Sequence, residues 1–360
     1  MLWNWQQKDW PEFTFDSQKL DEIETKFQYQ SGVLFGTLQH IQDNDKTFFI
    51  TEIMSDEAIR TSEIEGEYLN RESVQSSIQR NFGLAIKPQK MSPSEWGISE
   101  MMIDLYNEAQ QPLTHQTLFN WHEKLTNGRR DLKNIGQYRT DLEPMQIVSG
   151  YLPHPKVHFE APPAPIISNE MNQYIEWFNI KKYRPLTHAS IAHLYFECIH
   201  PFEDGNGRIG RALVVKSLSH ALKYPVLIAF SHIINKNKKK YYEMLELSNK
   251  KNEITEWILY FGQEILKAFD YTQNFIEFLI KKTKFYDKFR GQFNVRQEKV
   301  IERIFKEGID GFKGGLSAEN YIRITETSRA TATRDLQDLV NKGALSKEGN
   351  LKNTRYYLKN

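Results

Sequence analysis

The sequence predicts a mainly α-helical protein with one small β-hairpin and a C-terminal helical module that ends in a two-stranded wing. Apolar residues recur at helical spacing over most of the 360 residues. One stretch, "MQIVSGYLPHPKVHFEAPP", instead places two short β-prone runs, 145–149 and 156–160, around a turn rich in glycine and proline. The third observation is a change of composition near Phe275, after which the chain becomes basic and polar.

The helices follow from apolar periodicity and from capping residues. They are predicted over residues 18–38, 53–68, 91–109, 113–128, 169–180, 188–199 and 209–223. Ser92 or Ser94 is the expected N-cap of the third helix, and Gly128 is the expected C-cap of the fourth. These elements predict a helical core that the hairpin interrupts once.

Composition bounds the class of protein. Hydrophobic residues make up 39% and aromatic residues 13% of the chain, which is enough for packed cores and argues against disorder. The single cysteine, Cys198, excludes an internal disulfide framework and a multi-cysteine metal site. The N-terminus lacks a signal-peptide pattern and no run approaches 18 apolar residues, so we expect a soluble, cytoplasmic protein.

The net charge of +1 hides an uneven distribution. Residues 281–360 hold 18 Lys and Arg against 10 Asp and Glu, which gives +8 there and leaves −7 for the rest. The pattern over 316–358 predicts helix, turn, helix and a two-stranded wing, that is, a winged helix. One face of its second helix would reach DNA phosphates or bases through Arg329, Thr331, Thr333 and Arg334. The opposite face would pack in the core through Leu336, Leu339 and Val340. A solvated basic surface or a protein-docking module is the alternative.

The stretch "IHPFEDGNGRIGRA", residues 199–212, concentrates the chemistry. Pro201 disfavours a helical residue before it, so a helix should end just before His200 and the next should begin near Arg208. Gly205 and Gly207 are expected to take positive φ, which lets backbone N–H groups point into one concavity at a helix N-terminus. This geometry predicts a site for several phosphates.

The charged residues of this stretch suit such a site. Arg208 and Arg211 are three residues apart and can extend the anion site along one helix face. Asp204 would repel bare phosphates but not phosphates that share a Mg²⁺ ion with it. His200 has a side chain that titrates near neutral pH and can remove a proton from an incoming hydroxyl. Together these residues predict hydroxyl attack on a nucleotide phosphate.

The segment His200–Arg211 resembles the signature of the Fic family, HPFxDGNGRxxR, and fills every specified position. The resemblance also takes in "GQYRT" at 136–140 and the hairpin, and covers about residues 90 to 265. It implies a Fic-type helical bundle with the hairpin as a flap, and a protein adenylyltransferase that moves AMP from Mg-ATP to a target hydroxyl. The related Doc-like phosphotransferases have altered glycine-loop residues that this sequence does not share.

The resemblance assigns a role to each position. His200 is implied to be the base, Asp204 to bind Mg²⁺ and Phe202 to anchor the loop. The implied ATP-binding stretch is Gly205, Asn206, Gly207, Arg208, Ile209, Gly210 and Arg211. Downstream, "NKNKKKYYEMLELSN" resembles the family's base-binding segment, with Tyr242 and Asn249 against the nucleoside. The alternative for those two is an ordinary helix–helix contact.

"RTSEIEGEY", residues 60–68, matches the family's inhibitory pattern [ST]xxxE[GN] through Thr61, Glu65 and Gly66. The expectation is that Thr61 and Glu65 lie one turn apart on a helix, that Glu65 forms a bidentate pair with Arg211, and that Gly66 lets another backbone approach. The alternative is a solvated acidic helix.

The resulting hypothesis has three domains: residues 1–90 with the inhibitory helix, 91–270 as the catalytic core and 275–360 as the winged helix. The expected function is autoinhibited AMP transfer, with the target protein docked on the flap and a homodimer by analogy. The rival hypothesis is a DNA-binding regulator whose core senses nucleotide with little turnover.

Overall fold

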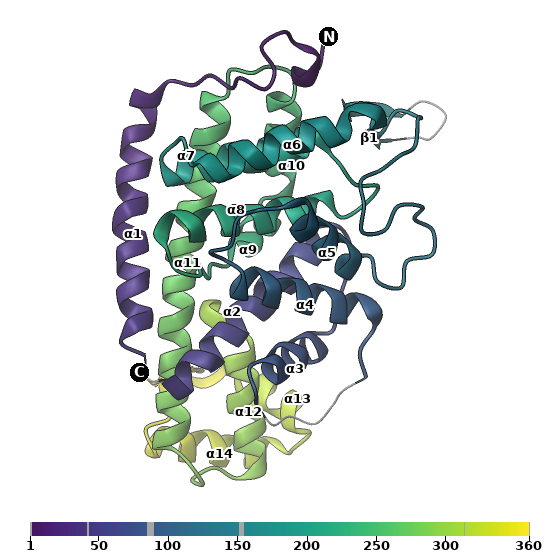
Figure 1. Ribbon diagram of the computed structural model, residues 1–360. Coiled ribbons are helices and arrows are strands. Elements are labelled where there is room, and N and C mark those ends of the chain that lie inside the picture. Colours follow the sequence, from purple (N-terminus) through teal and green to yellow (C-terminus); the bar gives the residue numbers. More distant parts are fainter. Residues whose placement is uncertain (1, 42, 85–89, 151–154, 313, 360) are drawn as a thin grey trace. The chain divides into compact units, whose positions relative to one another are not determined.

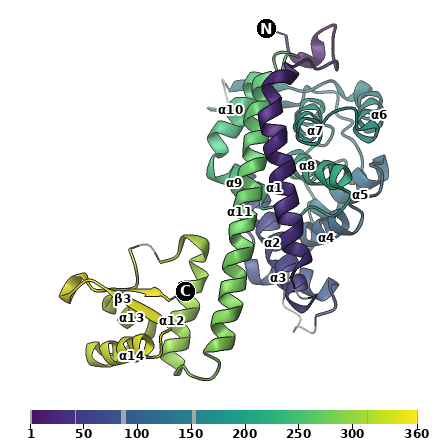
Figure 2. The ribbon, with the colours of Figure 1, turned by 90° about the vertical axis from the view of Figure 1, so that its left-hand side faces the viewer.

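The computed structural model describes residues 2–41, 43–84, 90–150, 155–312 and 314–359. The chain divides into two compact units, Met1–Thr272 and Gln273–Asn360 (Figures 1 and 2). Helices dominate, and the described strands form two separate two-stranded antiparallel hairpins. The predicted mainly α fold is therefore confirmed.

The first unit is a helical bundle with one hairpin. Its elements are α1 (Asp21–Gln39), α2 (Asp43–Ile64), α3 (Arg71–Asn81), α4 (Pro93–Asn107), α5 (His115–Leu125), β1 (Gln146–Ser149), β2 (Lys156–Glu160), α6 (Ala164–Ile180), α7 (Pro185–Ile199), α8 (Asn206–Leu222), α9 (Phe230–Lys236), α10 (Lys238–Ser248) and the first part of α11 (Thr255–Lys288). The predicted helices are present, with α2 beginning and ending earlier than expected. Helices α3, α9 and α11 were not predicted.

Helices α7 and α8 lie at the centre of this unit, with side chains buried around most of their circumference. The buried carboxylate of Glu24 on α1 accepts a hydrogen bond from the backbone N of Thr187, 2.8 Å away, and so caps the start of α7. Helix α1 runs beside α11 in both views, where Phe27 packs edge-on against Phe269 (Figures 1 and 2). The loop between α7 and α8 is thus held by two buried helices.

Local signals explain the helix boundaries. Ser92 caps α4, and its backbone N donates to Oε2 of Glu95 at 2.8 Å, which completes a capping box. Helix α5 ends at Leu125 with Thr126 as its C-cap, so the expected C-cap at Gly128 was wrong. Gly128 takes φ +85° in the turn that follows. The expectation of Ser92 as a cap is confirmed.

The hairpin pairs Gln146 with Glu160 and Ser149 with Lys156, with a bulge between Ile147 and Val148. Its turn, residues 151–154, lies outside the described residues. A bulge bends a strand and re-aims its side chains.

The second unit contains the end of α11, α12 (Val295–Lys306), α13 (Ala318–Thr325), α14 (Arg329–Asn341), β3 (Leu345–Glu348) and β4 (Arg355–Leu358). Leu336 and Leu339 of α14 are fully buried in its core and Val340 packs against them, as predicted. Helices α13 and α14 and strands β3 and β4 follow the order predicted over 316–358, and a winged helix stays a prediction. Among the described helices, none combines the length and apolarity needed to cross a membrane.

Candidate active site

Hydrogen bonds between its own residues fix the conformation of the loop between α7 and α8. His200 ends α7 in the left-handed region, with φ +50°. The backbone N of Phe202 donates to Oδ1 of Asn206 at 3.0 Å, and Nδ2 of Asn206 donates back to the carbonyl of Phe202 at 2.8 Å. The buried ring of Phe202 stacks on His122 with centroids 4.2 Å apart. Phe202 therefore anchors the loop. The side chain of Asn206 is used in hydrogen bonds to the loop backbone.

Gly205 and Gly207 are required to be glycine for different structural reasons. Gly205 takes φ +82°, as predicted, and precedes the first residue of α8. Gly207 is helical, so the prediction of a positive φ there was wrong. A Cβ on Gly207 would lie 2.3 Å from Oε1 of Glu65, so close approach of a carboxylate is what requires glycine. The first-turn N–H groups of α8 have no acceptor one turn earlier and suit an anion.

The backbone around His200 is fixed by a buried arginine. Nε of Arg139 donates to the carbonyl of His200 at 2.9 Å, and the backbone N of Arg139 donates to the carbonyl of Pro201 at 3.0 Å. Burial, followed by the charge of Arg139, lowers the pKa of His200 to about 4. The imidazole is therefore uncharged at neutral pH and can accept a proton.

A cavity of about 690 Å³ opens beside His200, which is within the range for small-molecule sites. The hairpin, α10, the α7–α8 loop and the end of α2 bound it. Its lining includes Glu65, Ile147, Val148, His158, Glu197, His200, Gly207, Arg211, Tyr242, Glu246 and Asn249. Six residues predicted from the sequence are thus brought together: His200, Gly207, Arg211, Glu65, Tyr242 and Asn249.

Arg211 is buried and bound to the end of α2. Its Nε donates to Oγ1 of Thr61 at 2.8 Å and its Nη2 donates to the carbonyl of Thr61 at 3.0 Å. Nη2 also lies 2.6 Å from Oε1 of Glu65. The expected bidentate Glu65 pair is wrong, because only Nη2 pairs with Glu65. Nε is bound to Thr61, and Nη1 has no partner among the described residues. The positive charge of Arg211 also interacts favourably with the C-terminal, negative end of the α2 dipole.

Glu65 lies just beyond α2 rather than within it, which corrects the expected helix position. Its backbone N donates to the carbonyl of Ser62 at 3.0 Å, and Gly66 follows with φ +83°. Nothing lies within 4 Å of a Cβ on Gly66, so this glycine serves backbone conformation rather than close approach. The helix end turns the chain so that Glu65 faces Arg211.

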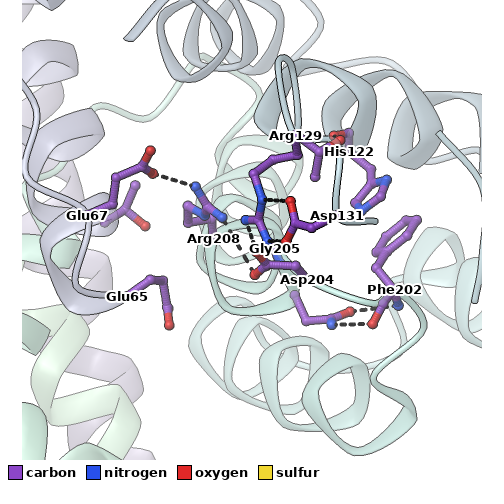
Figure 3. Close-up of polar contacts among 12 residues, drawn as sticks. Glu65, Glu67, His122, Arg129, Asp131, Phe202, Asp204, Gly205 and Arg208 are labelled. Carbon is purple, nitrogen blue, oxygen red and sulfur yellow. Dashed lines mark hydrogen bonds and ion pairs between the residues drawn. The ribbon is translucent and has the colours of Figure 1, made fainter. Parts of the chain in front are cut away.

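Arg208 and Asp204 form a second group of ion pairs (Figure 3). Nη1 of Arg208 lies 2.8 Å from Oε2 of Glu67, and Nη2 lies 3.7 Å from Oδ1 of Asp204. Nη1 of Arg129 lies 2.5 Å from Oδ2 of Asp204, while the same guanidinium holds Asp131 through two contacts. Burial raises the pKa of Asp204, but Arg208 and Arg129 outweigh it and keep this pKa below its ordinary value.

The segment predicted to bind the base lines the cavity through Tyr242 of α10 and Asn249 at its end. Tyr242 is 41% exposed there. Nδ2 of the buried Asn249 donates to the carbonyl of His158 at 3.3 Å, and its Oδ1 has no partner among the described residues. The N-terminal segment holds Asn249 in place. The backbone N of Asn4 donates to the carbonyl of Asn249 at 2.8 Å, and Nδ2 of Asn4 lies 3.0 Å from Sγ of Cys198.

Two predicted ATP-binding residues face the core instead of the cavity. Ile209 is fully buried. A Cβ on Gly210 would lie 2.5 Å from Oε1 of Glu197 and 3.1 Å from the His193 ring, so this glycine lets α8 approach α7. Neither contributes a side chain to the cavity, and their role toward ATP stays a prediction.

Sequence reasoning missed the partners of these residues: Glu67, His122, Arg129, Arg139 and Glu197. A signal existed for Glu67, which belongs to the acidic cluster already singled out around Glu65. Arg129, near the end of α5, carried none, since its partner Asp204 is 75 residues away.

Comparison with known proteins agrees with this geometry. Residues 112–218 match the Fic/DOC family, and residues 3–84 match a domain of unknown function, DUF4172. The "Protein adenylyltransferase Fic" of Aedes aegypti is 38% identical over 92 residues, which are 24% of this chain and 17% of that protein. The corresponding protein of Nematostella vectensis is 36% identical over 92 residues, 24% of this chain and 20% of that protein. The chain thus matches about a fifth of the length of these curated relatives.

Solved structures share the fold. A Fic family protein from Desulfovibrio desulfuricans superposes with a TM-score of 0.55 over 93% of this chain and 95% of the other, at 19% identity. A Fic domain containing signaling protein from Bacteroides thetaiotaomicron gives a TM-score of 0.53 over 73% and 97%, at 21% identity.

Proposed function

Because this chain is a Fic-family protein, with the Fic/DOC domain over residues 112–218, we propose that it transfers AMP from ATP to a hydroxyl side chain of a target protein. The observation that carries this proposal is one cavity that holds an uncharged His200, the N-terminal turn of α8 and Arg211. A base, an anion-binding helix end and a fixed cation are the groups that phosphoryl-type transfer requires.

In the proposed step, the target oxygen forms a bond to the α-phosphorus and the bond to the pyrophosphate oxygen breaks. His200 takes the hydroxyl proton, and pyrophosphate leaves with the bonding electrons. The N–H groups at the start of α8 stabilise the α-phosphate, and Arg208 and Arg211 hold the remaining phosphates. Tyr242 and the unpartnered Oδ1 of Asn249 would receive the base.

Asp204 is the residue that would hold Mg²⁺. No cluster of three or more metal-ligating side chains occurs in the described part of the chain. One carboxylate still fits the ion, since Mg²⁺ in nucleotide sites takes one or two carboxylates and completes its shell with phosphates and water. When bound, the ion would neutralise phosphate charge, and Asp204 keeps its pKa low enough to remain a carboxylate for it.

We further propose that Glu65 inhibits the site. Its carboxylate lies on Arg211 and against Gly207, where a phosphate would need the same cation and the same space. Helix α2 is held in this position by α9, because the buried Glu57 accepts hydrogen bonds from the backbone N and the hydroxyl of Ser231. ATP would then have to displace an intramolecular anion, which lowers its apparent affinity.

The test is incorporation of label from α-³²P-ATP into protein in the presence of Mg²⁺. Strong labelling by Glu65→Gly, weak labelling by the unchanged protein and none by Glu65→Gly/His200→Ala would support both chemistry and inhibition. If Glu65→Gly labels neither itself nor proteins of a host lysate, the proposed transfer is wrong.

The hairpin is the proposed docking site for the target. Ile147 and Val148 of β1 are each about two-fifths exposed, and β1 is an edge strand of a two-stranded sheet. An extended target segment can add to such an edge by main-chain hydrogen bonds and bring its hydroxyl toward His200. A homodimer remains a prediction by analogy.

DNA binding by the second unit is the second candidate function. Arg329, Thr333 and Arg334 are exposed on α14 while the opposite face is buried. Binding that survives His200→Ala, is lost in Arg329→Glu/Arg334→Glu and weakens steeply with salt would favour this function. Transfer of AMP to proteins without DNA would favour the enzyme.

A further inference from the structure

A buried carboxyl group that the proposed step does not use lies beside the proposed base. Glu197 is on α7, three residues before His200, and its side chain is 10% exposed. Its Oε2 lies 3.8 Å from Nδ1 of His200. This distance is too long for a hydrogen bond, but a shift of about 1 Å would make one. Hydrogen bonds of this kind often tighten only when substrate is bound.

Three buried polar atoms around this point lack partners among the described residues: Nδ1 of His200, Oε1 of Glu197 and Nη1 of Arg211. Buried polar atoms are rarely left unpaired, so a cluster of three calls for an explanation. All three residues line the same cavity. Glu197 thus shares one cavity with His200, the proposed base, and with Arg211, the arginine that Glu65 binds.

The packing of Glu197 is specified by its surroundings. A Cβ on Gly210 would lie 2.5 Å from Oε1, so the absence of a side chain there leaves room for this carboxyl group. Burial raises the pKa of Glu197 to about 8, while Arg211 lowers it and Glu65 raises it further. The carboxyl group is therefore mostly protonated at neutral pH, and the charges of Arg211 and of a forming His200 imidazolium are what favour its carboxylate form.

We propose that Glu197 is the positioning residue of His200, accepting the proton on Nδ1 so that Nε2 faces the target hydroxyl. This inference rests on the proposed AMP transfer. As the oxygen–phosphorus bond forms, the hydroxyl proton moves to Nε2 and the ring becomes an imidazolium with protons on both nitrogens. A carboxylate at Nδ1 stabilises that charge and excludes the tautomer that carries its proton on Nε2.

The groups that face this pair come from several elements. Arg139, the backbone carbonyl of Glu197, Glu65 and Asp204 act on His200, whereas Arg211 and Glu65 act on Glu197. Only Glu197 contributes a side-chain acceptor near Nδ1 in the described ion pairs. A change at Glu197 should therefore alter the ring of His200 more than it alters nucleotide binding.

The kinetic test uses the Glu65→Gly protein as its starting point. We expect Glu197→Ala to lower kcat by about tenfold or more, with KM for ATP changed by less than about threefold. Glu197→Gln keeps an oxygen acceptor and should restore part of this loss. Glu24→Gln is the matched control, because it changes a buried carboxylate at the other end of α7 and should leave kcat unchanged.

The second readout needs no turnover. With ¹⁵N-labelled histidine, the resonances of His200, assigned by their loss in His200→Ala, report the tautomer and pKa of the ring. Glu197→Ala should change both, Glu197→Gln should change the pKa while keeping the tautomer, and Glu24→Gln should change neither. If Glu65→Gly transfers no AMP, the proposed function fails, yet these resonances still decide the role of Glu197. Unchanged His200 resonances, or a loss confined to KM for ATP, would overturn the inference.

Discussion

One carboxylate oxygen, Oε1 of Glu65, lies 2.6 Å from Nη2 of Arg211. The same oxygen would be 2.3 Å from a Cβ on Gly207. It therefore covers the buried cation and the first turn of α8 at once, two features that an ATP phosphate would also need. Inhibition in this protein would be direct competition for a site rather than a distortion of it.

Substitution of Gly207 separates the contact of Glu65 with Arg211 from its occupation of the space over Gly207. Gly207→Ala should expel Glu65 from the turn, yet it should not raise AMP transfer as we expect Glu65→Gly to do, because the methyl group occupies space that the phosphate would need. In the Glu65→Gly background we expect AMP transfer to fall by at least about tenfold. Labelling from α-³²P-ATP measures both. Activation by Gly207→Ala would show that nucleotide does not use this space.

Glu67 should act as a weaker second anion. The two pairs are similarly buried: Glu67 and Arg208 are 33% and 6% exposed, and Glu65 and Arg211 are 30% and 1% exposed. Only Glu65 also occupies the space over Gly207. Arg208 keeps Asp204 as a second anionic partner when Glu67 is removed, so Glu67→Gln should tighten binding of Mg-ATP by at most about fivefold, on the order of 1 kcal/mol. Glu65→Gln should tighten it more. Calorimetric titration of a non-hydrolysable ATP analogue compares the two variants, and a larger effect of Glu67→Gln would contradict this ranking.

Arg129 should compete with Mg²⁺ for Asp204. Its guanidinium lies on Oδ2 of Asp204, and both side chains are about two-fifths exposed. Removal of this pair in Arg129→Gln should lower the Mg²⁺ concentration for half-maximal transfer by about two- to fivefold, measured in the Glu65→Gly background. Arg129→Lys keeps the charge and should change it less. A higher Mg²⁺ requirement in Arg129→Gln would mean that Arg129 orients Asp204 for the ion.

Local chemistry made much of the fold and the loop predictable. Apolar periodicity located the helices around the loop, and the clustered glycine and proline located the hairpin. His200 before Pro201 ended α7, because proline disfavours a helical residue before it. These features depend on neighbours in the chain, so the sequence alone expresses them.

Contacts between distant residues were not predictable in the same way. Arg208 and Glu67 are 141 residues apart, and Asp204 and Arg129 are 75 apart. The error at Gly207 has the same origin. A glycine in a turn motif suggests positive φ, whereas the structure shows a helical residue whose missing side chain admits Glu65. Tertiary packing, rather than the local backbone, determines what these residues do.

Gly210 offers a stability test of the α7–α8 contact. Gly210→Ala places a methyl group 2.5 Å from Oε1 of Glu197 and 3.1 Å from His193, so we expect a loss of about 1–3 kcal/mol in the free energy of unfolding. Gly32→Ala on α1 is the matched control. Nothing lies within 4 Å of its Cβ, and it should be neutral or stabilising by about 0.5–1 kcal/mol. Urea titration followed by circular dichroism measures both variants. Equal stability of the two would contradict the close packing at Gly210.

Glu57 should make stability depend on pH. Burial raises its pKa to about 7 from the ordinary 4.5, although its hydrogen bonds from Ser231 oppose the rise. Between these values the folded state holds a proton that the unfolded state has released. Stability from this group is therefore complete below pH 4.5 and is lost as pH rises through 7.

Glu57→Gln cannot titrate and keeps an acceptor for Ser231, so it removes this loss. The difference in unfolding free energy, variant minus unchanged protein, should grow by on the order of 2 kcal/mol between pH 5 and pH 8. Urea titrations at several pH values measure it, and the other titrating groups, histidines included, cancel because both proteins share them. A difference that stays constant with pH would mean that Glu57 is already a carboxylate at pH 5, held by Ser231 and by the charge of Arg211.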